Sequence, residues 1–142
     1  MDHVVYVDAK ANEMDCLINN EKTMIIRGAA GRKLPYDRVF ANDVLYFINN
    51  NAEGSVKAKG VVKTVMNSPK MSKDESIHLV EENQDKLRLT AKQTKRWAGK
   101  RYLVLIEVEN VVGIAPFPID KSGYGTMDDW LPVEDIESVK VS

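Results

Sequence analysis

Short apolar segments rich in β-branched residues recur along the chain, and their order constrains the fold more than any other feature of the sequence. Helical signals separate only some of these segments, whereas a doubly wound parallel sheet needs a helix between successive strands. The order therefore predicts an α+β fold: a small, mixed, closed or nearly closed β-barrel with short flanking helices. The segments predicted as its strands are His3–Val7, Thr23–Arg27, Asp43–Ile48, Ser55–Met66 and Arg101–Asn110.

Three helices are predicted from capping residues and apolar periodicity. The first extends over Ala9–Asn19, with Asp8 as its N-cap. The second begins at Ser72, which opens an S-x-x-E capping box. The third begins after Thr90 and carries Trp97.

The C-terminal part gives weaker signals. A separate short strand is predicted over Val112–Ile119, interrupted by Pro116 and Pro118. A turn is predicted at Pro132, and a last strand near Val139.

Length and cysteine content bound the architecture. The chain has 142 residues, which is about one domain, so we expect a single domain over residues 1–142. Its one cysteine, Cys16, excludes an internal disulfide and a multi-cysteine zinc site. No apolar run approaches the roughly 18 residues of a membrane span, and the N-terminus lacks the features of a signal peptide. A reducing, cytoplasmic setting away from membranes is the simplest expectation.

A net charge of −1 conceals a strong segregation of charge. The segment Lys22–Arg101 holds 17 basic and 8 acidic residues, whereas the rest of the chain holds 3 basic and 13 acidic residues. The densest basic stretch, Lys86–Arg101, contains no acid, and the tail Glu107–Glu137 is acidic. Such asymmetry can mark a basic binding face, although pairing between the two regions, or simple solvation of the charges, is an equally open explanation.

Familiar catalytic and metal-binding patterns are missing from the sequence. His3 and His78 are isolated from each other, and neither has a second histidine at metal-ligand spacing. The segment Gly28–Lys33 resembles a phosphate loop but lacks its spacing, so we interpret it as a turn with two basic residues. No catalytic residue, metal or cofactor is therefore predicted.

Two groups of basic residues are candidates for ligand binding. Lys22, Arg27, Arg32 and Lys33 flank one predicted strand and its exit turn. Lys22 and Arg27 are five residues apart and point to opposite faces of a regular strand, so only a strand end or barrel rim brings them together.

The second group surrounds a tryptophan. Trp97 lies among basic residues, with Lys100 and Arg101 at the junction between a helix and a strand. Single-stranded nucleic-acid binders combine a stacking aromatic ring with phosphate-holding cations in this way. The alternative is that Trp97 packs the helix onto the sheet, as large aromatic residues commonly do.

Residues 20–27 resemble the ASCH-domain motif G-x-K-x-x-E-x-R. Lys22 and Arg27 match it, whereas Asn20 takes the place of the glycine and Ile25 that of the glutamate.

Two later segments extend the resemblance to roughly residues 9–110. Asn42–Phe47 is similar to the family's glycine–aspartate strand, and Tyr102–Val108 is similar to the later strand that crosses the barrel. The same order of elements is similar to the related EVE and PUA domains. The resemblance implies a PUA-like pseudo-barrel that binds RNA or modified bases.

One branch of the ASCH family is enzymatic and hydrolyses N4-acylated cytidine, with a lysine, a threonine and a glutamate in its site. The resemblance places the lysine at Lys22, the threonine at Ile25 and the glutamate at Ala91. Isoleucine has no nucleophilic oxygen and alanine transfers no proton, so we expect this chemistry to be absent.

The sequence therefore predicts a domain that binds RNA or a nucleotide in a basic cleft. Two alternatives stay open: a hydrolase acting on a modified nucleoside, and a protein-interaction module that uses the acidic tail. The residues predicted to contact the ligand are Lys22, Arg27, Arg32, Lys33, Trp97, Lys100 and Arg101.

Overall fold

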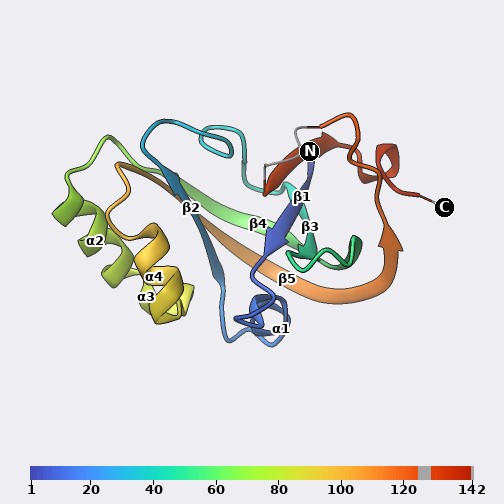
Figure 1. Cartoon of the computed structure of the whole chain (residues 1–142), viewed down its shortest axis with the longest axis horizontal. Coiled ribbons are helices and arrows are strands. Elements are labelled where there is room, and N and C mark those ends of the chain that lie inside the picture. Colours follow the sequence, from blue (N-terminus) through green and yellow to red (C-terminus); the bar gives the residue numbers. More distant parts are fainter. Residues whose placement is uncertain (125–128, 142) are drawn as a thin grey trace.

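The computed structural model describes residues 1–124 and 129–141, and its strands form one six-stranded sheet. The sheet curls into a mixed half-barrel in the order β2–β5–β4–β3–β1–β6 (Figure 1). The predicted α+β class with a mixed barrel and short helices is confirmed, although β2 and β6 end the sheet instead of pairing. The strands are β1 (Asp2–Val7), β2 (Met24–Ala29), β3 (Val44–Asn49), β4 (Ser55–Asn67), β5 (Tyr102–Pro118) and β6 (Trp130–Glu134).

Short helices flank the sheet. Figure 1 shows α2, α3 and α4 gathered at one end of the sheet, near β2. The predicted capping box at Ser72 is present, and the predicted cap Thr90 forms a second one. Each side chain accepts a bond from the amide of the third helical residue. No helix in the described part of the chain is long and apolar enough to cross a bilayer. The helices are α1 (Glu13–Ile18), α2 (Lys73–Glu82), α3 (Gln84–Leu87), α4 (Ala91–Trp97) and a 3₁₀ turn, η1 (Ile136–Ser138).

The apolar runs of the inner strands arise because both of their faces are buried. Alternate residues point to opposite faces of a strand. On β5, Val104 and Ile106 join a central cluster to which all six strands contribute, whereas Leu103 and Leu105 pack in a second cluster with residues of α2, α3 and α4. The second cluster fixes the helices against β2 and β5.

The first helix is shorter than predicted. Residues 9–12 form turns, and α1 begins at Glu13 instead of Ala9. Asn12 adopts a left-handed φ of 53°, which an α-helix does not accommodate. The Asp8 carboxylate accepts a bond from the Ala11 amide, so it stabilises the turn instead of capping a helix.

The C-terminal strands also differ from the prediction. The separate strand at Val112–Ile119 does not exist, because β5 continues without a break to Pro118. Beyond Glu107, β5 pairs with β4 alone, so Pro116 does not interrupt a central ladder. Pro132 lies inside edge strand β6, and Val139 follows η1 instead of forming a strand.

A buried histidine network joins the N-terminus to β6. The indole N–H of Trp130 donates to Nδ1 of His3 over 3.1 Å, and Nε2 of His3 lies 2.9 Å from a carboxylate oxygen of Asp43. Because an indole nitrogen only donates, Nδ1 must accept and the ring proton lies on Nε2. Burial lowers the pKa of His3 below its ordinary value, and the N-terminal amine adds to this effect. The Asp43 carboxylate raises the pKa but does not outweigh burial.

The network makes stability depend on pH. Because the pKa of His3 is lower in the folded than in the unfolded chain, the unfolded chain binds more protons below about pH 6.5. We expect the free energy of unfolding to fall as the pH drops from 7.5 to 5.5, by at most about 1.4 kcal/mol per pH unit from His3. Urea denaturation of the wild type and of His3→Gln, which carries no titratable ring, measures this difference. Parallel pH profiles for the two proteins would contradict it.

Candidate functional site

A cleft of about 230 Å³ lies between the exit of β2 and the end of α4. A cavity of about 100 Å³ adjoins it, and both are lined by Arg27, Arg96, Trp97 and Asp129. We call the two together the Arg27 cleft. The larger part also includes Gly28, Lys33, Leu34 and Lys100, and the smaller part Tyr6, Asp8, Glu13, Asn50 and Gln93.

Arg27 forms the wall between the cleft and the central cluster. Its position on β2, two residues after Ile25, directs it to the interior face, and only 6% of it is exposed. One terminal nitrogen donates to the carbonyl of Ile26 over 2.8 Å, and the other donates to the carbonyl of Tyr6 over 2.6 Å. The guanidinium thus links β2 to β1, two strands that do not pair in the sheet.

Asp129 provides a carboxylate inside the cleft. One of its oxygens lies 3.3 Å from Nε of Arg27 and 3.8 Å from a terminal nitrogen of Arg96. The first contact has ion-pair distance but not hydrogen-bond geometry, so Nε has no hydrogen-bond partner among the residues that the structure describes. The backbone of Asp129 is held by Tyr6, whose amide donates to its carbonyl over 3.0 Å.

Trp97 serves both the core and the cleft. It is 8% exposed and packs in the second cluster, which agrees with the core alternative for this residue. Arg96 lies over its ring at 4.3 Å, and the guanidinium of Arg27 is 5.8 Å from the ring centre. Little of the ring is left for a ligand, whereas the Arg96 side chain is 62% exposed.

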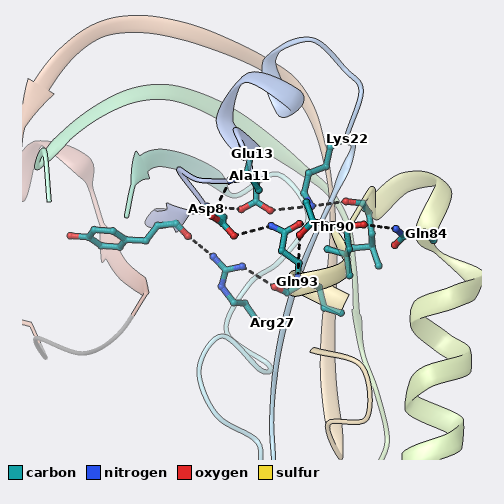
Figure 2. A network of polar contacts seen from close by, with 12 residues as sticks. Asp8, Ala11, Glu13, Lys22, Arg27, Gln84, Thr90 and Gln93 are labelled. Carbon is teal, nitrogen blue, oxygen red and sulfur yellow. Dashed lines mark hydrogen bonds and ion pairs between the residues drawn. The ribbon is translucent and has the colours of Figure 1, made fainter. Parts of the chain in front are cut away.

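Lys22 lies outside the Arg27 cleft. It is 2% exposed, forms an ion pair of 3.0 Å with Glu13 and donates to the carbonyl of Leu87. Glu13 in turn accepts a bond from the amide of Asp8. These contacts tie α1 to the start of β2 and to α3 (Figure 2), which is a structural role. A contact between Lys22 and ligand stays a prediction.

The other predicted residues divide between the cleft and its surroundings. Lys33 and Lys100 line the cleft and are exposed. Arg32 instead lies over the rings of Tyr36 and Tyr102, at 5.6 and 5.7 Å. Arg101 is exposed and does not line the cleft.

Two of the four residues that line both parts of the cleft, Arg96 and Asp129, were not among those predicted to contact a ligand. Arg96 belongs to the basic stretch around Trp97, and this position in the sequence could have identified it as a candidate ligand contact. Asp129 gave no comparable signal, because it belongs to an acidic tail distant in sequence from Arg27. Its ion pairs with Arg27 and Arg96 show that the acidic tail contacts the basic region of the chain in the folded protein.

The smaller part of the cleft has an acidic end. Figure 2 shows Asp8, Glu13 and Gln93 pointing toward one another next to Arg27. The side-chain amide of Gln93 donates to Asp8 over 3.4 Å, a long hydrogen bond. The cleft can therefore accept hydrogen bonds from a ligand at this end and hold negative charge at the other.

The positions matched to hydrolase residues show no catalytic arrangement. Ile25 is fully buried in the central cluster, and Ala91 is exposed at the start of α4. No group of three or more histidine, cysteine, aspartate or glutamate side chains is placed to hold a metal ion within residues 1–124 and 129–141.

Two solved structures of the ASCH protein of Zymomonas mobilis are similar to this chain. A tyrosine-to-phenylalanine variant superposes with a TM-score of 0.71 at 10% identity, covering 96% of this chain and 93% of that one. The protein without a named substitution superposes with a TM-score of 0.64 at 13% identity, covering 94% and 89%. The chain has the ASCH fold. No family model matches the sequence, and no curated protein matches it.

The match confirms the PUA-like, ASCH-related fold that the resemblance at residues 20–27 implied. At this low identity it is a likeness of fold. In this chain Lys22 lies just before β2 and Arg27 lies inside it. Within this ASCH fold, Lys22 and Arg27 both join β2 to other elements.

The buried ion pair yields a prediction on stability. Lys22→Met leaves the carboxylate of Glu13 without its cation, so we expect it to lower the free energy of unfolding by about 3 kcal/mol. Adding Glu13→Gln removes the stranded charge and retains an acceptor for the amide of Asp8, so the double variant should regain part of the loss. Urea denaturation at pH 7 measures both. A single variant as stable as the wild type, or a double variant no better than the single one, would show that the pair has no such role.

Proposed function

We propose that this chain binds single-stranded RNA or a nucleotide in the Arg27 cleft. The observation that supports the proposal most is the convergence of four cations, from β2, the following loop, α4 and the segment after it, on one cleft. Among the residues that the structure describes, these cations face a single carboxylate in the larger part, that of Asp129. A surplus of positive charge in a concave site attracts phosphate groups. The cations are Arg27, Lys33, Arg96 and Lys100.

The stacking surface in this proposal is the face of the Arg96 guanidinium, and the N–H groups at its edge can contact a phosphate at the same time. The guanidinium rests on the ring of Trp97 and is largely exposed, and bases stack on guanidinium planes as well as on aromatic rings. Trp97 then acts mainly by holding Arg96 in place. The ASCH fold is in keeping with the proposal, because the resemblance to this family implies RNA binding.

The acidic end suits the hydrogen-bond donors of a base or ribose. Asp8 has a carboxylate oxygen whose partner, Gln93, is 3.4 Å away, so a closer donor can replace that bond. The proposal is for binding and not for hydrolysis, since Ile25 and Ala91 provide neither a nucleophile nor a proton at the matched positions. Lys22, Arg32 and Arg101 lie outside the Arg27 cleft and are not needed for it.

Salt dependence and charge removal test the proposal. A labelled oligouridylate of about eight nucleotides is titrated with protein at several salt concentrations, with anisotropy as the readout. Arg96→Gln and Lys100→Gln should each weaken binding and reduce the slope of log K against log salt by about one.

Lys63→Gln is the matched control, because it removes an exposed cation of β4 that does not line the cleft. It should leave both the affinity and the slope near the wild-type values. Binding that ignores salt, or a loss with Lys63→Gln equal to that with Arg96→Gln, would refute the site.

A further inference from the structure

The guanidinium of Arg27 has a buried donor that the fold does not use. Its two terminal nitrogens donate to the carbonyls of Ile26 and Tyr6, whereas Nε has no hydrogen-bond partner within the described residues. Arg27 is 6% exposed and lines both parts of the cleft. Buried polar groups in folded proteins nearly always have partners, so an unmatched N–H beside a cleft indicates a missing acceptor.

Asp129 is next to this donor but is a poor acceptor for it. Its carboxylate lies 3.3 Å from Nε without hydrogen-bond geometry, and 3.8 Å from Arg96. The bond from the amide of Tyr6 to the carbonyl of Asp129 holds the backbone and limits where the short side chain can reach. A phosphate group is not tethered and can align an oxygen with Nε.

The carboxylate can leave without disturbing the fold. The Asp129 side chain is 39% exposed, and both of its ion pairs are made by side-chain atoms. The backbone bond to Tyr6 remains if the side chain turns to solvent. Partly exposed ion pairs of this length are weak, so a stronger anion can replace this one.

We propose that Asp129 occupies, in the free protein, the place of a ligand phosphate on Arg27 and Arg96, and that it lowers the affinity of the cleft for phosphate groups by competition. The inference rests on the proposed function and adds to it a specific subsite and an affinity-setting residue. The chemical class is a phosphate group, in a terminal monoester or in the diester backbone of RNA.

The test compares Asp129→Asn with the wild type by calorimetric titration. Asparagine has the same shape and keeps the backbone bond but removes the competing charge. We expect uridine 5′-monophosphate to bind about two- to fivefold more tightly to the variant. Asp129→Glu retains a carboxylate and should not gain affinity. Uridine without phosphate should bind equally to all of these proteins.

The matched control is Asp85→Asn, which changes the net charge equally at an exposed residue of α3 that does not line the cleft. It should leave the affinity unchanged. If Asp129→Asn binds the monophosphate no more tightly than Asp85→Asn does, the inference is overturned. The proposed function then still stands if the wild type binds RNA, and both fail if no protein binds nucleotide or RNA.

Two further probes distinguish the source of the phosphate. Inorganic phosphate reports on the subsite alone, and an oligouridylate with hydroxyl ends contains only diester phosphates. If Asp129→Asn increases the affinity for the monophosphate but not for this oligonucleotide, the subsite binds a terminal phosphate. A gain for both assigns it to the backbone, and either pattern supports competition by Asp129.

Discussion

The guanidinium of Arg27 connects parts of the half-barrel that backbone hydrogen bonds leave separate. β2 is an edge strand, and β1 lies near the opposite edge of the sheet, yet one side chain on β2 donates to a carbonyl of β1. A buried charge is tolerated only where its donors are satisfied, and two carbonyls satisfy the terminal nitrogens. The arrangement leaves Nε without a hydrogen-bond partner among the described residues, 3.3 Å from a carboxylate oxygen of Asp129, and this is where we propose that an anion binds.

The fold and the proposed binding site therefore depend on the same residue. The backbone bond between Tyr6 and Asp129 brings the chain entering β6 to β1, and this places a carboxylate beside the arginine. α4 adds Arg96 and Trp97 from the other side, held by the second cluster. The site assembles only when strands, helix and tail are all in position.

Much of the fold was predictable because its signals are local. Apolar runs such as Tyr102–Val108 indicate strands whose two faces are buried, and the capping boxes at Ser72 and Thr90 fix two helix starts. The start of α1 was not predictable, because it depends on the left-handed backbone of Asn12. β5 reaches its full length because it pairs with β4. The low strand propensity of proline at Pro116 had instead predicted a break in the strand.

The candidate site was predictable only in part, for the same reason. Arg27, Lys33 and Lys100 could be found from local basic clusters, and the structure brings them to one cleft. The burial of Lys22 depends on Glu13, a partner that no spacing rule connects to it. Asp129 reaches Arg27 through the arrangement of β1 and β6, so its contact follows from tertiary structure and not from motif.

The most direct test of the account is a nuclear magnetic resonance titration that follows the Nε–H signal of Arg27 as the oligouridylate is added. The account predicts a large, saturable shift of this signal, as a phosphate oxygen provides the missing acceptor. An Arg27 signal that stays in place while signals of residues away from the cleft move on binding would contradict the account.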